Sequence, residues 1–298
     1  MRRVRASLFG MSESEVYELL DHSRRGWESD GPRPVRTHVW EPAGRPPKPP
    51  VALLSHGTGG SALDLGWLAD ALAGAGFLVA AVDHHGNTST GRSLPEGFAF
   101  VWERPRDLSF VLGWLERERP IGAAGVAGFS LGGYSAAALV GARLSPEKVR
   151  AVLDGVVPAP PLPEFPGLID ALRSRVPPDE LRRRIEEAGA TVADPRILAA
   201  FLISPAIGQL VDESSLTAVD RPVAIRWGGA DDNSPGSENA LRYGRGIPGA
   251  EVSCLGETVG HYEFADDIAG AGPVRAQVAA DAVAFLNRNL KLSAAARP

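Results

Sequence analysis

Residues 125–133 have the sequence Gly-Val-Ala-Gly-Phe-Ser-Leu-Gly-Gly, and the fold prediction starts from them. Residues 128–132 fit the pattern G-x-S-x-G, in which a serine lies on a sharp turn between a strand and a helix. Side chains two positions before or after that serine would collide with neighbouring segments, so Gly128 and Gly132 leave room for the turn. We therefore expect Ser130 at the end of a strand and at the start of a small-residue helix over 131–142.

Short apolar runs alternate with amphipathic segments on either side of this motif. The runs that predict strands are 51–55, 77–82, 125–128, 197–203 and 223–227, with a last strand-like segment at 251–255. Apolar residues at helical spacing mark helices around 65–72, 108–115 and 274–285. Apolar strands that alternate with helices indicate an α/β fold, in which a mostly parallel central sheet is covered by helices on both faces.

Two regions depart from this alternation. Between about residues 144 and 193 there is a proline-rich stretch at 158–163 and a helix-like segment at 178–189. A connection of roughly fifty residues is too long for an ordinary link between a helix and a strand, so we predict a helical cap insertion there. Residues 1–30 are an extension with no predicted place in the fold, although 12–22 has a helix-like pattern. We expect one domain over residues 1–298.

The composition excludes several classes of protein. The chain has 298 residues and a net charge of −5, with no long basic run, which argues against nucleic acid as a partner. The single cysteine, Cys254, excludes an internal disulfide and a cysteine-based zinc cluster. The apolar stretch after the basic residues 2–5 is too short for a signal peptide, and no apolar run is long enough to span a bilayer. We therefore expect a soluble, cytoplasmic protein.

His261 is the predicted partner of the serine. A serine hydroxyl is a poor nucleophile at neutral pH and needs an adjacent base. The chain has six histidines, and His261 alone follows Ser130, as the chain order serine, acid, histidine requires. His84 and His85 come directly after Asp83, but consecutive side chains at a strand end point apart, so we expect no metal site there.

The acid of the predicted site comes from the loop after the strand at 223–227. Asp231 and Asp232 lie together in that loop, and a buried carboxylate there would orient the imidazole of His261 and stabilise its charged form. The pattern of residues alone leaves both aspartates as candidates.

The turn His56-Gly57-Thr58-Gly59-Gly60 follows the strand at 51–55. In proteins with the G-x-S-x-G turn, this place supplies one backbone amide of an oxyanion hole, and the residue after the serine supplies the other. We therefore predict Thr58 and Leu131 as the donors. The turn fits neither of the common phosphate-binding patterns, so we expect no nucleotide. The candidates for the substrate pocket are ring-bearing side chains near these motifs: Phe129, Tyr262, His85 and Trp102.

From about residue 33 to residue 285, the assembled segments resemble the dienelactone hydrolase-like branch of the α/β-hydrolases, especially its platelet-activating-factor-acetylhydrolase-like members. The motifs that carry the resemblance are 56–60, 83–88, 104–107, 128–133, 194–197, 228–231 and 260–262. The family's Gly-x-x-Asp acid loop falls on 228–231, which selects Asp231. By the same matching, the resemblance implies Ser130 as nucleophile, His261 as base, and the amides of Thr58 and Leu131 as oxyanion donors.

The resemblance also implies a reaction. A serine hydrolase of this kind cleaves a carboxylic ester, or a lactone or thioester, through an acyl-enzyme, and it needs no metal and no organic cofactor. Its partner is a small-molecule acyl substrate. Three alternatives remain open at this point: an acyltransferase or cyclase-type thioesterase with an acceptor other than water, a non-catalytic ligand-binding protein with the same fold, and a peptidase.

Overall fold

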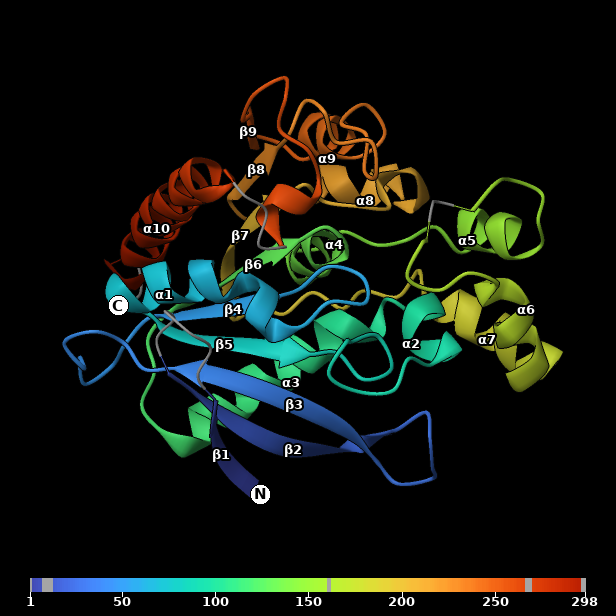
Figure 1. Ribbon diagram of the computed structural model, residues 1–298, viewed down its shortest axis with the longest axis horizontal. Coiled ribbons are helices and arrows are strands. Elements are labelled where there is room, and N and C mark those ends of the chain that lie inside the picture. The colour runs from blue at the N-terminus through green and yellow to red at the C-terminus, as the bar shows by residue number, and fades with distance from the viewer. Residues whose placement is uncertain (1, 7–12, 160–161, 266–269, 296–298) are drawn as a thin grey trace.

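The computed structural model describes residues 2–6, 13–159, 162–265 and 270–295 (Figure 1). Within these residues, nine strands form one sheet in the order β1-β2-β3-β5-β4-β6-β7-β8-β9. The strands are β1 (Arg2–Ala6), β2 (Ser14–Arg25), β3 (Pro32–Trp40), β4 (Val51–Ser55), β5 (Leu78–Asp83), β6 (Ala124–Phe129), β7 (Ile197–Ile203), β8 (Val223–Trp227) and β9 (Glu251–Cys254). The strands predicted at 51–55, 197–203 and 223–227 are confirmed at the same bounds.

The sheet is parallel over its larger part. The strands from β5 through β4, β6, β7 and β8 to β9 run parallel to one another, whereas β1, β2 and β3 join one side in antiparallel pairs. In the register between β4 and β6, Ser55 is paired with Gly128. Because the carboxyl ends of parallel strands meet at one edge of the sheet, the turns after β4 and β6 emerge side by side.

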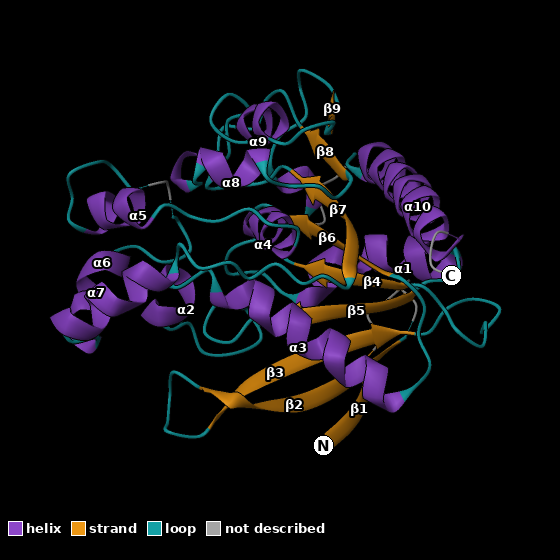
Figure 2. Cartoon of the chain, turned by 180° about the vertical axis from the view of Figure 1, so that it is seen from behind, coloured by secondary structure: helices purple, strands orange, loops and turns teal. Residues whose placement is uncertain are grey.

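Helices cover both faces of the sheet, as the alternation predicts (Figures 1 and 2). Apolar side chains of α1 (Gly66–Gly74) and α10 (Gly272–Ala295) form one core layer. Those of α3 (Glu103–Glu118), α4 (Leu131–Leu139), α8 (Glu213–Thr217) and α9 (Ala240–Gly246) belong to the core on the other face. The fold class predicted from the sequence is therefore confirmed.

The region from 144 to 193 contains three helices, α5 (Pro146–Leu153), α6 (Leu168–Arg175) and α7 (Pro178–Glu187), so the helix predicted at 178–189 is confirmed. Together with α2 (Pro95–Ala99), they lie beyond the carboxyl ends of the central parallel strands (Figure 1). Helix α6 packs against α2, and α5 packs against α7. Pro160 and Pro161 of the proline-rich stretch lie outside the described residues.

The helix-like reading of residues 12–22 is wrong, because Ser14–Arg25 forms the strand β2. Tyr17, Leu19 and Asp21 are buried, while the side chains between them are exposed, which is the alternation of a strand. The leucines and glutamates of this segment favour a helix locally, but pairing with β1 and β3 decides its structure. The residues of 1–30 that are described therefore belong largely to the antiparallel side of the sheet rather than to a separate extension.

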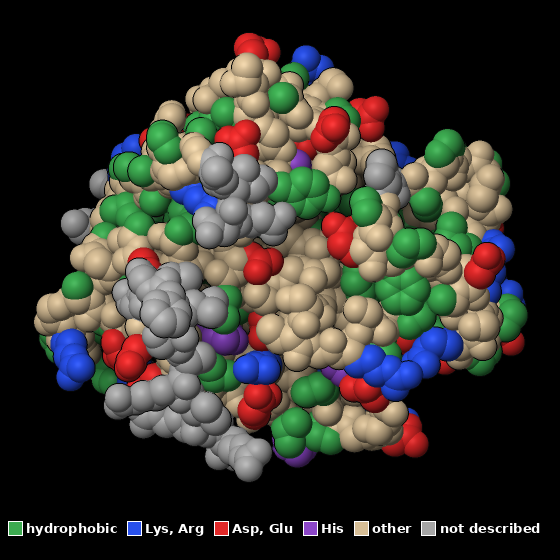
Figure 3. Space-filling model, in the orientation of Figure 1, with side chains coloured by type: hydrophobic (Ala, Val, Ile, Leu, Met, Phe, Trp, Pro, Cys, Tyr) green, Lys and Arg blue, Asp and Glu red, His purple; other side chains and the backbone are tan. Residues whose placement is uncertain are grey.

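The described part of the chain contains no helix long and apolar enough to cross a membrane. On the face drawn in Figure 3, basic side chains lie among acidic ones and do not form one continuous basic surface. This distribution agrees with the absence of a long basic run in the sequence.

Candidate active site

Ser130 lies on a strained turn between β6 and α4. Its φ angle of 55° and ψ angle of −120° belong to a region that residues other than glycine rarely adopt. A Cβ atom at Gly128 would overlap the carbonyl of Gly132, and a Cβ atom at Gly132 would overlap the carbonyl of Ser55. The crowding that the G-x-S-x-G pattern predicts is therefore present at both glycines.

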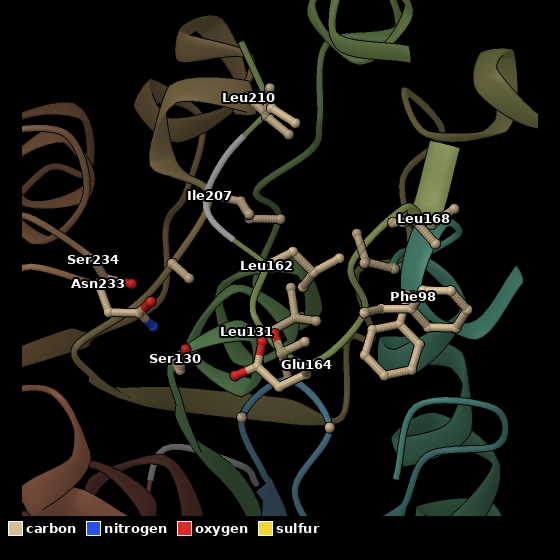
Figure 4. A pocket seen from close by; sticks show the side chains of 18 of the residues that line it. Phe98, Ser130, Leu131, Leu162, Glu164, Leu168, Ile207, Leu210, Asn233 and Ser234 are labelled. Atoms are coloured by element: carbon tan, nitrogen blue, oxygen red, sulfur yellow. The ribbon is translucent and has the colours of Figure 1, made fainter. Parts of the chain in front are cut away.

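Main-chain hydrogen bonds hold this turn in place. The Ser130 amide donates to the carbonyl of Ile203 at the end of β7, at 2.9 Å. The Ser130 carbonyl accepts from Gly133 at 2.8 Å and from Ala206 at 3.0 Å. The bonds to Ile203 and Ala206 tie the turn to the segment that ends β7 and follows it, and so hold its backbone in place. Figure 4 shows the Ser130 hydroxyl facing a cavity.

His261 connects Ser130 with Asp231. Its Nε2 lies 3.0 Å from the Ser130 hydroxyl oxygen, and its Nδ1 lies 2.7 Å from Asp231 Oδ2. All three side chains are buried, with exposed fractions of 5%, 3% and 5% for the serine, the histidine and the aspartate. We call these three residues the cavity relay. The order of donors and acceptors is that of a hydroxyl, a base and the carboxylate that orients the base.

The structure distinguishes the two candidate aspartates. Asp231 is buried and binds His261, whereas Asp232 is exposed. The second carboxylate oxygen of Asp231 accepts a hydrogen bond from the amide of Ser234 at 2.7 Å, so both oxygens of this buried group are satisfied. The choice of Asp231 from the Gly-x-x-Asp loop therefore agrees with the geometry.

Thr58 and Leu131 line the same cavity as Ser130. Leu131 is the first residue of α4, and the first amides of a helix have no partner within it. The turn at 56–60 is held by a hydrogen bond from the Gly59 amide to the side-chain oxygen of Asn87, at 2.6 Å. The two predicted oxyanion donors thus come from adjacent segments that meet beside the serine.

The cavity has a volume of about 650 Å³ and extends from the cavity relay toward α5 and α6. Most of its lining side chains are apolar, including Phe98, Leu162, Leu168, Ile207 and Leu210 (Figure 4). The charged side chains among the described residues that line it are carboxylates, with no lysine or arginine: Asp64, Glu164, Asp170 and Glu238. The space fits a small, largely apolar molecule.

Three of the four predicted pocket residues line this cavity. The ring centroid of Phe129 lies 4.8 Å from that of His261, and the ring of Tyr262 also packs against His261. Trp102, the residue directly before α3, lines the cavity as well. The prediction for His85 is wrong, because it does not line the cavity and its Nε2 instead accepts a hydrogen bond from the amide of Trp27 at 3.0 Å. His85 lies close to the motifs in the sequence, but that closeness does not determine where its side chain points after the end of β5.

Several residues that line the cavity were not predicted from the sequence. Glu164 comes from the loop between α5 and α6, and Asn233 and Ser234 come from the loop that also carries Asp231. Figure 4 shows Glu164 pointing into the cavity. The position of Asn233 and Ser234 directly after the acid was a usable signal, whereas nothing local marks Glu164.

A second serine, histidine and aspartate lie beneath the turn at 56–60. Ser55 Oγ is 2.9 Å from His84 Nε2, and His84 Nδ1 is 3.0 Å from Asp107 Oδ2. The exposed fractions are 0%, 0% and 1%, and none of the three lines the cavity. We call them the buried relay.

The buried relay is held by charges from the antiparallel side of the sheet. Asp107 binds Arg33 through two hydrogen bonds of 2.7 and 3.0 Å, and it also binds Arg24. Despite burial, these arginines hold the pKa of Asp107 well below its usual range. Burial, together with the nearby guanidinium of Arg104, lowers the pKa of His84 to about 4, so its ring is neutral at pH 7.

No group of three or more metal-ligating side chains occurs among the residues that the structure describes. His84, His85 and Asp83, which follow one another in the sequence, have separate hydrogen-bond partners. Asp83 accepts from the Ala62 amide at 2.7 Å and from Thr90 at 2.8 Å, while the two histidines bind Asp107 and Trp27 as described above.

A scan against protein-family models and a search of curated proteins each found no match. Solved structures do match over nearly the whole chain. A cold-adapted esterase from an Arctic intertidal metagenomic library is 15% identical with a TM-score of 0.58, and the match covers 97% of this chain and 100% of that one. A ferulic acid esterase from Streptomyces cinnamoneus is 20% identical with a TM-score of 0.60, over 93% and 89%.

A thermophilic esterase from Thermogutta terrifontis, solved with butyrate, is 14% identical with a TM-score of 0.56, and the match covers 91% of this chain and 94% of that one. At these identities the likeness concerns the fold. Together with the mostly parallel sheet and the helices on both faces, it shows that the chain has the α/β-hydrolase fold.

Proposed function

We propose that this protein is a serine hydrolase that cleaves a carboxylic ester through an acyl-enzyme on Ser130. One observation carries the proposal: the ring of His261 lies between the Ser130 hydroxyl and the Asp231 carboxylate, at 3.0 and 2.7 Å, on the wall of a cavity. This arrangement activates a hydroxyl that is otherwise a weak nucleophile.

The mechanism follows from the positions of these groups. His261 takes the proton of Ser130 as its oxygen attacks the ester carbonyl carbon, and the negative charge develops on the former carbonyl oxygen. The amides of Leu131 and Thr58 stabilise that oxyanion. His261 then gives its proton to the departing alcohol, and water, activated by the same imidazole, releases the acid from Ser130. Asp231 holds the imidazole in the required tautomer and stabilises its charged form.

The region from 144 to 193 serves as a cap in this proposal. Val149 and Leu153 of α5 and Leu168 of α6 line the cavity, which supports a role in binding the apolar part of the substrate. The assignment to the dienelactone hydrolase-like branch rests on the sequence motifs. The similar folds of the metagenomic, Streptomyces and Thermogutta esterases support ester hydrolysis as the reaction.

The proposal is tested with p-nitrophenyl esters of increasing acyl length and with Ser130→Ala. The variant removes one hydroxyl and leaves the fold intact, so we expect kcat to fall by roughly four to six orders of magnitude. Retention of wild-type turnover by Ser130→Ala would exclude this nucleophile. Mass spectrometry of the products in the presence of alcohols and amines distinguishes hydrolysis from transfer to another acceptor.

A further inference from the structure

Arg104, the second residue of α3, is a buried cation that the proposed chemistry does not use. Its exposed fraction is 1%, its hydrogen-bond partners among the described residues are uncharged oxygens, and its Nη1 has none there. Burying a charge costs several kcal/mol unless it is well paired, and an apolar side chain of similar volume would avoid that cost. Packing alone therefore does not account for an arginine at this position.

The first contact of Arg104 reaches the turn that carries Thr58. Its Nη2 donates to the carbonyl oxygen of His56, the first residue of the 56–60 turn, and lies 3.5 Å from the hydroxyl of Ser55. A charged donor makes a stronger hydrogen bond to a carbonyl than a neutral donor does. The guanidinium thus restrains the peptide that leads to the predicted oxyanion donor at Thr58.

The second contact reaches the helix that carries Leu131. Arg104 Nε lies 3.4 Å from the hydroxyl of Ser135, and that hydroxyl donates to the carbonyl of Leu131 at 3.1 Å. Ser135 has an exposed fraction of 0%. One guanidinium therefore contacts both segments that supply the predicted oxyanion donors, and neither Arg104 nor Ser135 lines the cavity.

The buried relay keeps Arg104 charged and in position. Asp107 lies one helical turn further along α3, and its negative charge stabilises the cation, although burial lowers the pKa of Arg104 to about 9. With His84 donating to Asp107 through Nδ1, its Nε2 accepts from the hydroxyl of Ser55. That leaves a lone pair of the same hydroxyl facing Arg104 Nη2.

We propose that Arg104 is a positioning residue of the oxyanion hole, which sets the distance between the amides of Thr58 and Leu131 by binding the two segments that carry them. This inference rests on the proposed ester hydrolysis. Because Arg104 and the groups that it contacts do not line the cavity, loss of Arg104 affects the charged intermediate and leaves substrate binding unchanged.

The test compares Arg104→Met, which keeps the volume without the donors, with Arg104→Lys. Each kcat is divided by the number of active sites titrated with a fluorophosphonate, so that unfolded protein does not count. For Arg104→Met we expect kcat to fall about tenfold to a hundredfold while KM stays within about twofold, and for Arg104→Lys a partial recovery of kcat. A trifluoromethyl ketone, whose adduct places an oxyanion in the hole, should lose affinity in the same order.

Arg33→Met is the matched control, because it removes another buried arginine bound to Asp107 that touches neither oxyanion segment. We expect it to lower the unfolding temperature and to leave kcat per titrated site within about twofold. If both Arg104 variants fail to fold, Ser135→Ala tests the contact to α4, with an expected loss of about twofold to fivefold in kcat at unchanged KM.

The outcomes separate this inference from the proposed function. A wild-type protein that turns over no ester and takes no label at Ser130 overturns the proposed function itself. An active wild type together with unchanged kcat per site in Arg104→Met, or in Ser135→Ala where the former does not fold, overturns the role of Arg104 alone. If Arg33→Met lost as much kcat per site and as much affinity for the trifluoromethyl ketone as Arg104→Met, the role of Arg104 would be structural only.

Discussion

The cavity relay and the buried relay contain the same three residue types at nearly the same distances. The hydroxyl–imidazole distances are 3.0 and 2.9 Å, and the imidazole–carboxylate distances are 2.7 and 3.0 Å. Their surroundings differ. The serine of the cavity relay has a strained backbone at a helix N-terminus and faces an open cavity, whereas the serine of the buried relay ends a regular strand and faces Arg104.

Hydrogen-bond geometry among a serine, a histidine and an aspartate therefore does not by itself define a reactive site. A substrate carbonyl needs space beside the hydroxyl and donors for its developing charge. Of the two relays, the cavity relay lies on a cavity that the two predicted donors, Thr58 and Leu131, also line. In the buried relay the same geometry satisfies three polar groups within the core and supports the turn above it.

Replacing the two serines in turn has the largest expected effect. Ser130→Ala should abolish labelling by a fluorophosphonate probe and lower esterase kcat by roughly four to six orders of magnitude. Ser55→Ala should keep the label on Ser130 and lose no more than about fivefold in kcat, because it weakens only the support of the turn. Gel fluorescence and peptide mass spectrometry check the labelled residue; label on Ser55 would contradict the comparison.

Replacing the two aspartates should separate activity from stability. Asp231→Asn keeps the shape but favours the wrong tautomer of His261, so kcat should fall by about four orders of magnitude with little change in unfolding temperature. Asp107→Asn removes the carboxylate that pairs with the buried Arg33 and one of the three carboxylates that bind Arg24, so it should reduce the free energy of unfolding by about 3–5 kcal/mol. Urea unfolding and kcat per titrated site are measured for both variants, and the reverse pattern would refute the assignment.

Buried histidines, one of them in the buried relay, should also make stability depend on pH. Burial lowers the pKa of His84 and of His85 to about 4, whereas both titrate near 6.5 in the unfolded chain. Between these values the unfolded chain binds more protons, so the stability present above pH 6.5 is lost as the pH falls toward 4. The slope should be about 1.4 kcal/mol per pH unit for each such histidine.

Urea unfolding at pH 7.0, 6.0 and 5.0 measures this slope above the range in which most carboxylates of the unfolded chain titrate. The pKa of His56 is also lowered by burial, so His85→Gln removes one of several contributing histidines and should reduce the slope without altering the cavity. A free energy of unfolding that is constant over this range would contradict the prediction.

The smallest expected effect concerns the charge of the substrate. The carboxylate of Glu164 points into a cavity whose described lining has no lysine or arginine, so it should favour a cationic ester. The ratio of kcat/KM for choline butyrate to that for its uncharged analogue 3,3-dimethylbutyl butyrate should fall by about twofold to fivefold in Glu164→Gln. Glu180→Gln, on α7 and outside the cavity, is the control, and an equal change in both variants would refute a role for Glu164.

The sequence predicted those parts of the molecule in which local pattern and tertiary structure agree. The turn around Ser130, the parallel strands and the pairing of Ser130 with His261 follow from patterns that have a steric or chemical cause, whereas the choice of Asp231 over Asp232 came from the family resemblance. Strand β2 was not predictable in this way, because its leucines and glutamates favour a helix until β3 pairs with it.

The buried relay also could not be predicted from local sequence patterns. Its three members come from β4, from the residue after β5 and from α3, and Arg24 and Arg33 reach it from strands on the antiparallel side of the sheet. The direction of His85 and the entry of Glu164 into the cavity depend likewise on packing between distant segments. Such contacts depend on how the helices and strands are arranged in space, and they produce no periodic pattern in the sequence.

The strained backbone of Ser130 matters for engineering this protein toward higher stability. A φ angle of 55° suits glycine better than serine, so the residue that the proposed reaction requires is one that the backbone disfavours. Screening variants for thermal stability alone would therefore select replacement of the nucleophile by glycine, which gives a more stable but inactive protein. A directed-evolution campaign on this scaffold needs turnover as a second selection at every round.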